Sequence, residues 1–276
     1  MSHRHSKTTP NWKLILLAII VVTVVFAVFA YRKEDSLRSA GSNDRSDVTG
    51  HIPNLHIAAG SDGKIKDYEG FTVAFNKSNR TPDWVGWELT ADEAYGSESR
   101  SDNFWCDYAL EGCAEPADYR NSGYDRGHLC PAADQKWSPA AMSDCFVMAN
   151  MTPQDHALNA GAWATLEEKE RLWAKRDSAI VIVAGPIYKD SDRKHIGSGV
   201  RVPSAFFKVL LAPYLPTPRA IGFIYPNMRA PGNMADYSMS VDRVEAATGL
   251  DFFSSLPDSI ENIVESRASF TEWNRK

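Results

Sequence analysis

A histidine follows a charged pair set between glycines in GYDRGH, residues 123–128. With an ordinary pKa of about 6.5, a neutral histidine can accept a proton from water at physiological pH. A nucleophile elbow would instead make Asp125 the nucleophile, but that turn needs a strand before it and a helix after it. AEPADYRNS carries no strand pattern, and Pro131 interrupts any helix. The stretch is therefore either a general-base site built on His128 or a surface turn with an Asp–Arg pair.

Oxygen donors and a further arginine follow this histidine. Asn150, Asn159 and Glu167 lie in NMTPQDHALNAGAWATLEEKER, and Arg171 stands four residues after Glu167, on the same face of a helix. Mg²⁺ keeps several waters and needs only one or two protein oxygens when a phosphate supplies others. A base, a sparse oxygen-ligand site and arginines that spread developing charge suit phosphodiester hydrolysis.

These segments resemble the DNA/RNA non-specific endonucleases, the ββα-metal nucleases that include endonuclease G. The resemblance rests on DRGH, NMTPQ and LNAGAWATLEEKER, and it extends through TPDWVGWEL, VIVAGPIY, VPSAFFKVLL and TGLDFFSSLPD over residues 67–258. It implies the ββα-metal nuclease fold. It also implies a magnesium-dependent enzyme, with manganese as the alternative ion, that cleaves DNA and RNA without sequence preference.

The resemblance also gives each matching residue a role. His128 corresponds to the general base, and Asn159 to the protein ligand of a single magnesium ion. Glu167 resembles the acid that holds the water ligands of the metal in place. The remaining matches are Arg126 as the arginine of the motif, Arg171 as the helix arginine that stabilises phosphorane-like charge, Asn150 as the supporting asparagine, and Arg100, in a loop of variable length, as the upstream arginine.

Structural roles stay open for the same residues. Asn159 suits a helix N-cap, and Glu167 with Arg171 suits a plain ion pair on a solvated face. His156 is expected on the surface, because an imidazole nitrogen suits magnesium poorly. A protein of another class, a non-catalytic membrane-tethered nucleic-acid binding or uptake module, would need arginine and lysine but neither a base nor a metal ligand.

The elements that must position these residues alternate between strand and helix patterns. We expect strands at 71–75, 83–89, 145–151, 179–188, 205–212 and 220–225, and helices at 158–176 and 240–249, with a loop over 96–124. Ser240 is a suitable N-cap and Gly249 a suitable stop for the second helix. Together they predict an α+β fold with a largely antiparallel central sheet flanked by helices.

An uncharged run precedes this domain at residues 14–31. At about 1.5 Å per residue it just crosses a bilayer core. It predicts a transmembrane helix that anchors the chain, with a cleaved signal peptide as the alternative. Residues 1–13 would form a cytoplasmic tail, residues 32–66 a flexible linker and residues 67–276 the nuclease domain.

A non-specific nuclease would damage its own genome, so we expect the nuclease domain on the non-cytoplasmic side of the membrane. The periplasm, the exterior or, in a eukaryote, the mitochondrial intermembrane space meets this requirement. The net charge of −5 is not that of a generic nucleic-acid binder, so any DNA or RNA site must be a local basic patch.

Four cysteines match no metal-site spacing. Behind a membrane anchor they favour disulfides, with Cys106–Cys113 and Cys130–Cys145 as the predicted pairs, and reduced core thiols are the alternative. The sequence leaves the oligomeric state open, with a homodimer as one option.

Overall fold

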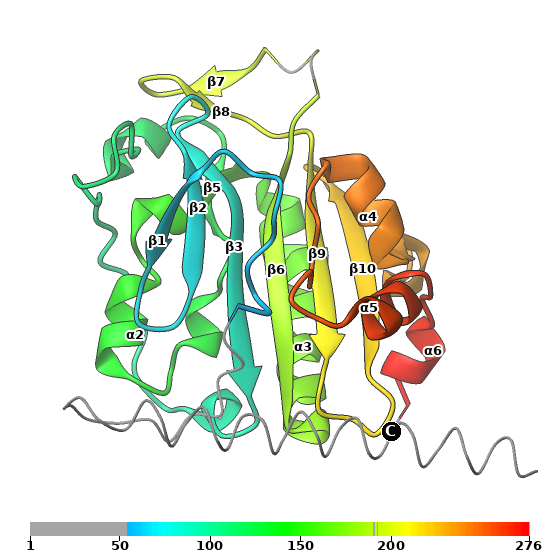
Figure 1. Cartoon of the computed structure of the whole chain (residues 1–276). Coiled ribbons are helices and arrows are strands. Elements are labelled where there is room, and N and C mark those ends of the chain that lie inside the picture. The colour runs from blue at the N-terminus through cyan, green and yellow to red at the C-terminus, as the bar shows by residue number, and fades with distance from the viewer. Residues whose placement is uncertain (1–53, 190, 192, 276) are drawn as a thin grey trace, which may run out of the picture. The chain divides into compact units, whose positions relative to one another are not determined.

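A seven-stranded sheet organises the protein, for which the computed structural model describes residues 54–189, 191 and 193–275 (Figure 1). Its strands, which are antiparallel to each neighbour, lie in the order β1 (Lys64–Asp67), β2 (Thr72–Asn76), β3 (Thr81–Thr90), β6 (Ala179–Ile187), β9 (Ala205–Ala212), β10 (Arg219–Pro226) and β11 (Ser238–Met239). Two small antiparallel pairs accompany it: β4 (Asp125–His128) with β5 (Met151–Gln154), and β7 (His195–Ile196) with β8 (Val200–Arg201).

The helices are short apart from one. They are α2 (Pro139–Asp144), α3 (Ala164–Asp177), α4 (Val241–Thr248), α5 (Asp258–Glu265) and α6 (Phe270–Trp273). Single 3₁₀ turns occur at η1 (Glu93–Tyr95), η2 (Pro116–Tyr119), η3 (Ala132–Asp134), η4 (Met148–Asn150) and η6 (Met234–Tyr237), and a π-helical turn, η5 (Leu158–Trp163), leads into α3.

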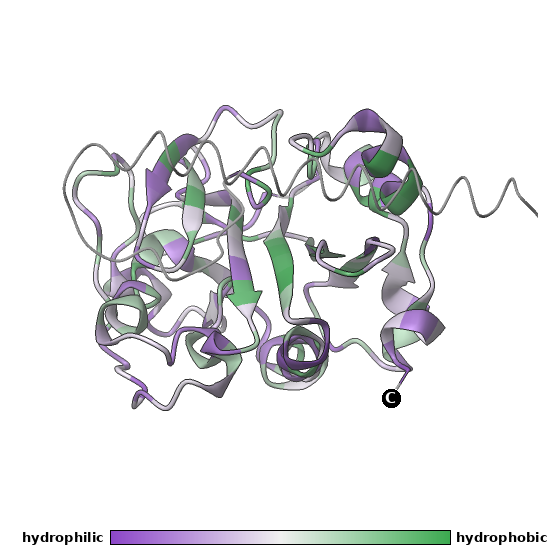
Figure 2. Ribbon diagram, turned by 60° about the horizontal axis from the view of Figure 1, so that its bottom comes forward, coloured by the Kyte–Doolittle hydropathy of each residue, from purple (hydrophilic) through white to green (hydrophobic). Residues whose placement is uncertain are grey.

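The sheet is buried on both faces, which gives the domain two cores. Successive residues of a strand point to opposite faces. Ile182 of β6 therefore packs on the face that holds α3, with Trp173, whereas Val183 packs on the other face with Val244 of α4 and Val264 of α5. Hydrophobic segments accordingly gather on the central strands (Figure 2). The result is three layers, with α3 on one side of the sheet and α4 and α5 on the other.

Most of the predicted elements are confirmed. The expected strands at 71–75, 83–89, 179–188, 205–212 and 220–225 correspond to β2, β3, β6, β9 and β10, and the mixed fold with a largely antiparallel sheet is the one observed. Helix 240–249 is α4, and Gly249 ends it with φ 74°, the left-handed conformation that glycine adopts without steric cost.

The predicted strand at 145–151 is wrong. Ser138 caps α2 by accepting hydrogen bonds from the amides of Ala140 and Ala141, and this helix runs to Asp144 with Cys145 as its C-cap. The apolar residues that follow are buried in the 3₁₀ turn η4, and the strand β5 begins only at Met151. A short apolar run does not distinguish a strand from other buried segments.

The packed part of the chain begins before the predicted boundary at residue 67. Leu55 and Ala58 are buried in the core beside α4 and α5, and the amide of Ala59 donates to the carbonyl of Asp251 at 2.8 Å. The predicted tail, the predicted anchor at 14–31 and the greater part of the predicted linker lie outside the described residues. Within residues 54–275, apart from 190 and 192, no helix has both the length and the apolar character to span a membrane.

The predicted disulfides are also wrong, because all four cysteines are buried free thiols. Each thiol has another partner, which for the Sγ of Cys113 is the carbonyl of Ala114 at 3.7 Å. Cys106 and Cys145 donate through Sγ to the carbonyls of Cys113 at 3.6 Å and Met142 at 3.2 Å. The Sγ of Cys130 accepts from Gln135 Nε2 at 3.1 Å. The cysteines are therefore the reduced core thiols of the alternative interpretation.

Candidate active site

A strand pair followed by a helix carries the DRGH motif. β4 pairs with β5 so that His128 faces Met151, and the chain then passes through η5 into α3. Gly127 lets the two strands approach, since a Cβ there would lie 2.4 Å from the Oε1 of Gln154. This ββα arrangement brings the end of the histidine strand next to the helical turn that contains Asn159.

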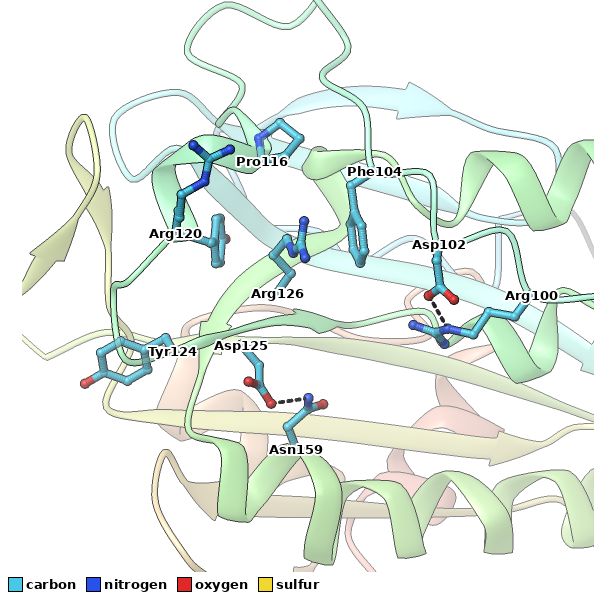
Figure 3. A pocket seen from close by; sticks show the side chains of 10 residues that line it. Arg100, Asp102, Phe104, Pro116, Arg120, Tyr124, Asp125, Arg126 and Asn159 are labelled. Atoms are coloured by element: carbon cyan, nitrogen blue, oxygen red, sulfur yellow. Dashed lines mark hydrogen bonds and ion pairs between the residues drawn. The ribbon is translucent and has the colours of Figure 1, made fainter.

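Two adjoining cavities lie at this junction and share Arg100, Arg126 and Asn159. The smaller, of about 190 Å³, is also lined by His128 and Glu167. The larger, of about 580 Å³, is lined by Arg100, Asp102, Phe104, Pro116, Tyr119, Arg120, Tyr124, Asp125, Arg126 and Asn159 (Figure 3). The structure thus brings together five of the predicted site residues: Arg100, Arg126, His128, Asn159 and Glu167.

His128 is held by aromatic rings. Its ring lies 5.0 Å from that of Phe146, edge to face, and 5.7 Å from that of Phe104. Its Nε2 is buried and has no hydrogen-bond partner among the described residues. Burial lowers the pKa of His128 to about 3, with the charges of Arg100 and Arg126 adding to the effect and that of Asp102 opposing it. The imidazole is therefore neutral at physiological pH, and its Nε2 makes no hydrogen bond with the described residues.

Asp125 fixes the orientation of Asn159. The Nδ2 of Asn159 donates to Asp125 Oδ2 at 2.8 Å (Figure 3). His156 Nδ1 lies 2.8 Å from the same oxygen. The amide oxygen of Asn159 has no hydrogen-bond partner within the described chain. Asn159 is not a helix N-cap, because it lies inside η5, whose N-cap is Ala157. His156 is on the surface as predicted, with 79% of its side chain exposed.

Glu167 lies next to a buried charge network that sequence reasoning missed. Lys208 of β9 is fully buried, and its Nζ lies 2.9 Å from Glu170 Oε2 and 3.9 Å from Glu167 Oε1. Burial raises the pKa of Glu167 to about 8, with Lys208 opposing the rise and Glu170 adding to it. The signal in the sequence is the lone lysine of AFFKVLLA, since a charge inside a buried strand needs a buried partner.

Two predicted site residues do not line either cavity. Arg171 turns away, and its Nη1 donates at 3.0 Å to Asp134, a fully buried carboxylate. Asn150 is fully buried; its Oδ1 accepts from the amide of Cys130 at 2.9 Å, and its Nδ2 donates at 2.8 Å to the carbonyls of Cys130 and Cys145. Asn150 therefore fixes the chain just beyond His128 against the end of α2.

The predicted loop at 96–124 supplies the predicted Arg100 and, in addition, cavity residues that the sequence did not single out. Phe104 lies under the Arg126 guanidinium, 4.0 Å from its ring centre, so the arginine is oriented by a cation–π contact. Arg100 lies 4.9 Å from the ring centre of Phe146, and its Nε donates to Asp102 at 2.6 Å. Arg120 adds a third guanidinium at the rim. No periodic pattern marks a loop residue that reaches a distant site.

The donor set fits a hydrated divalent ion. Asn159 and Glu167 supply an amide and a carboxylate oxygen to a cavity of about 190 Å³. Such a space admits several waters, each of which occupies about 30 Å³ in the liquid. Few protein oxygens and several waters are the usual surroundings of Mg²⁺. The residues that line the smaller cavity therefore fit such an ion.

The model of the DNA/RNA non-specific endonuclease family matches residues 50–259. The chain belongs to this family. A nuclease of Nostoc sp. is 32% identical over 210 residues, which cover 71% of this chain and 76% of the relative. Human mitochondrial endonuclease G is 30% identical over 220 residues, which cover 70% of each chain.

A solved structure agrees with this family assignment. The crystal structure of an EndoG/EndoGI complex superposes with a TM-score of 0.59 at 27% identity, covering 70% of this chain and 86% of the other. As a member of the non-specific endonuclease family, the protein is a hydrolytic nuclease of a metal-dependent kind.

Proposed function

We propose that this protein hydrolyses phosphodiester bonds of DNA and RNA without sequence preference, with His128 as general base and Mg²⁺ as the metal. The observation that carries the proposal is the buried, unpartnered Nε2 of a neutral His128. His128 lines a cavity that Asn159 and Glu167 also line.

The chain's own residues account for proton transfer and charge stabilisation. The neutral His128 accepts a proton from the attacking water, and the flanking aromatic rings hold the imidazole in one orientation. Arg100 and Arg126 contact phosphate oxygens and spread the charge that develops in the transition state. A bound Mg²⁺, held directly by Asn159 and through its water ligands by Glu167, would supply Lewis-acid stabilisation of the phosphate and the leaving oxygen.

The substrate range follows from the same contacts. Guanidinium groups that contact phosphates do not distinguish one base from another, so they can bind DNA or RNA of any sequence. A membrane-tethered module that only binds nucleic acid remains the competing function. It would require the arginines of the cavity but not an unpartnered histidine beside two oxygen donors.

Two substitutions test the assignment of base and ligand. His128→Ala should lower kcat at least about 10²-fold and leave Mg²⁺ binding largely intact, because it removes a general base and no ligand. Asn159→Ala should lower both the activity and the Mg²⁺ affinity. Cleavage of DNA with and without EDTA, with calorimetry of Mg²⁺ binding, measures both, and His195→Ala, at an exposed histidine on β7, is the control.

The opposite pattern would overturn the assignment. If His128→Ala abolished Mg²⁺ binding while Asn159→Ala preserved it, the site would be a histidine-ligated metal centre. If the wild-type protein bound DNA and cleaved none in Mg²⁺ or Mn²⁺, the binding module would be the correct function.

For location, we propose a single-pass membrane anchor at residues 14–31, with the nuclease domain on the non-cytoplasmic side. The uncharged length of this run supports the anchor. Relatives from zebrafish, budding yeast and human carry mitochondrial in their names, which supports a mitochondrial location in a eukaryotic cell. Protease added to intact spheroplasts of a bacterial host should digest the domain, and full protection would contradict this topology.

A further inference from the structure

Three acidic side chains converge on the side of the sheet that faces away from α3. Asp242 and Glu245 belong to α4, and Glu265 is the last residue of α5, which lies beside α4 (Figure 1). Each offers a carboxylate oxygen, and these oxygens all lie within 4.8 Å of one another. Since α3 and the cavities around His128 are on the opposite side of the sheet, this cluster is separate from the candidate active site.

The surroundings of Glu265 are unfavourable for a negative charge that has no positively charged partner. Its side chain is buried, with the residue only 5% exposed, and its Oε1 has no hydrogen-bond partner among the described residues. It also stands at the C-terminal end of α5, where the helix dipole disfavours a negative charge. An ionised carboxylate in such a place is costly unless a cation neutralises it.

The surroundings supply only more negative charge. The carboxylates of Glu245, Glu261, Asp242 and Asp251 all disfavour a negative charge on Glu265. Within the described residues, no ion pair joins Glu265 to a lysine, arginine or histidine. The cluster therefore lacks the cation that would balance it.

We propose that Asp242, Glu245 and Glu265 form a calcium site that joins α4 to α5. An all-oxygen set of carboxylates selects a hard cation. Ca²⁺ takes about six to eight oxygen ligands in a flexible geometry, whereas Mg²⁺ demands a near-ideal octahedron and is usually bound by only one or two carboxylates. The three carboxylate oxygens all lie within 4.8 Å of one another and come from two helices, a set that suits Ca²⁺ better than Mg²⁺.

The calcium site is structural, because it connects elements of the second core. Glu245 Oε1 accepts from the amide of Phe252 at 2.9 Å, and Phe252 and Phe253 are fully buried beside α4 and α5. An ion held by Glu245 and Glu265 stabilises this connection. Its binding raises the stability of the domain and leaves the turnover of the distant cavity unchanged.

Thermal unfolding of the full chain tests the site. The parent for all variants is Asn159→Ala, which removes the proposed catalytic ligand, so that a metal effect reports on the cluster. Glu265→Gln removes the buried charge, and Asp258→Asn removes an exposed charge from the same helix as a matched control. Each is melted in EDTA and then in Ca²⁺ or Mg²⁺ between about 10⁻⁶ and 10⁻³ M, at constant ionic strength.

We expect Ca²⁺ at about a hundred times its Kd to raise the Tm of the parent and of Asp258→Asn by about 5–10 °C. Glu265→Gln should show no such rise, and in EDTA it should melt at or above the parent, because a buried charge is gone. No rise in the parent, or an equal rise in Glu265→Gln, would overturn the proposal. So would a lower Tm of Glu265→Gln in EDTA, and an equal effect of Mg²⁺ would overturn the assignment to calcium.

Discussion

At the scale of single residues, His128 shows how burial prepares a base. The ring sits against Phe146 and Phe104, and this burial, more than any charge, depresses its pKa to about 3. An ordinary histidine titrates at about 6.5 and would lose half of its neutral form there. Because the neutral form is the active one, a depressed pKa keeps the base competent at lower pH.

The pH dependence of cleavage follows from the lowered pKa of His128. In wild type, kcat/KM should stay level as pH falls through about 6.5 and should decline only at a lower value. After burial, the charge of Arg100 contributes most to the lowered pKa of His128, so Arg100→Gln should move the acidic limb to higher pH. Arg229→Gln, at an exposed arginine, is the control. A wild-type midpoint at or above 6.5, or an unmoved limb in Arg100→Gln, would contradict this account.

Asn150 contributes through the backbone that it holds. Asn150→Ala leaves three buried backbone groups of Cys130 and Cys145 without their partner, and each such loss costs about 1–3 kcal/mol. We expect the free energy of unfolding to fall by at least about 2 kcal/mol in urea titrations. Asn103→Ala, at an exposed asparagine, should change it by less than about 0.5 kcal/mol. Equal effects of the two substitutions would show that the buried bonds contribute little.

The sequence identified the residues of the cavity better than their directions. His128, Asn159 and Glu167 follow from the segments DRGH and LNAGAWATLEE, which resemble motifs of the nuclease family. A motif does not specify which way a long side chain turns, and Arg171 points to Asp134 because that buried carboxylate needs a cation. Asp134 itself carries no sequence signal, since it lies in a single 3₁₀ turn.

At the scale of elements, a buried ion pair fastens α3 to the sheet beneath the cavity. Lys208 of β9 reaches Glu170 of α3 at 2.9 Å, and its Nζ lies 4.5 Å from the ring centre of Trp163. Removing one partner of a buried pair leaves an uncompensated charge, which costs about 3–5 kcal/mol. We expect Lys208→Met to destabilise the domain by this amount, as measured by urea unfolding.

A second substitution separates the charge from the packing. Lys208→Met with Glu170→Gln removes both charges, so it should recover much of the lost stability. The matched surface pair is Lys77 with Glu111, 3.1 Å apart and exposed, where Lys77→Met should cost less than about 1 kcal/mol. If the double variant were no more stable than Lys208→Met, the loss would come from packing against Trp163 instead.

Elements with strong periodicity were predictable, and elements defined by contacts were not. The β-branched run of β6 and the apolar run of β9 indicate buried central strands. The DRGH strand β4 has no such pattern, because it is short and contains Gly127, and only its pairing with β5 makes it a strand. Residues 145–151 look like a strand because they are apolar, yet their burial comes from packing in a turn after α2.

At the scale of the whole molecule, the net charge does not predict where nucleic acid binds, because the arginines are gathered locally. The chain carries a net charge of −5, so its surface as a whole repels a polyanion. The larger cavity gathers three arginines, Arg100, Arg120 and Arg126, from separate stretches of the chain (Figure 3). Nucleic acid should therefore bind through this one patch, with affinity supplied by the release of counterions from phosphates.

The salt dependence of DNA binding measures how many phosphates these arginines neutralise. For three neutralised phosphates, a plot of log K against log[salt] should have a slope of about −2 to −3. Anisotropy titrations of labelled DNA with the His128→Ala protein measure binding without cleavage. Arg120→Gln should make the slope shallower by about 1, because Arg120 lines the cavity, whereas Arg243→Gln, an exposed arginine on α4, should leave it unchanged. Equal changes from both substitutions would mean that nucleic acid senses the net charge of the molecule and that the cavity is not its binding site.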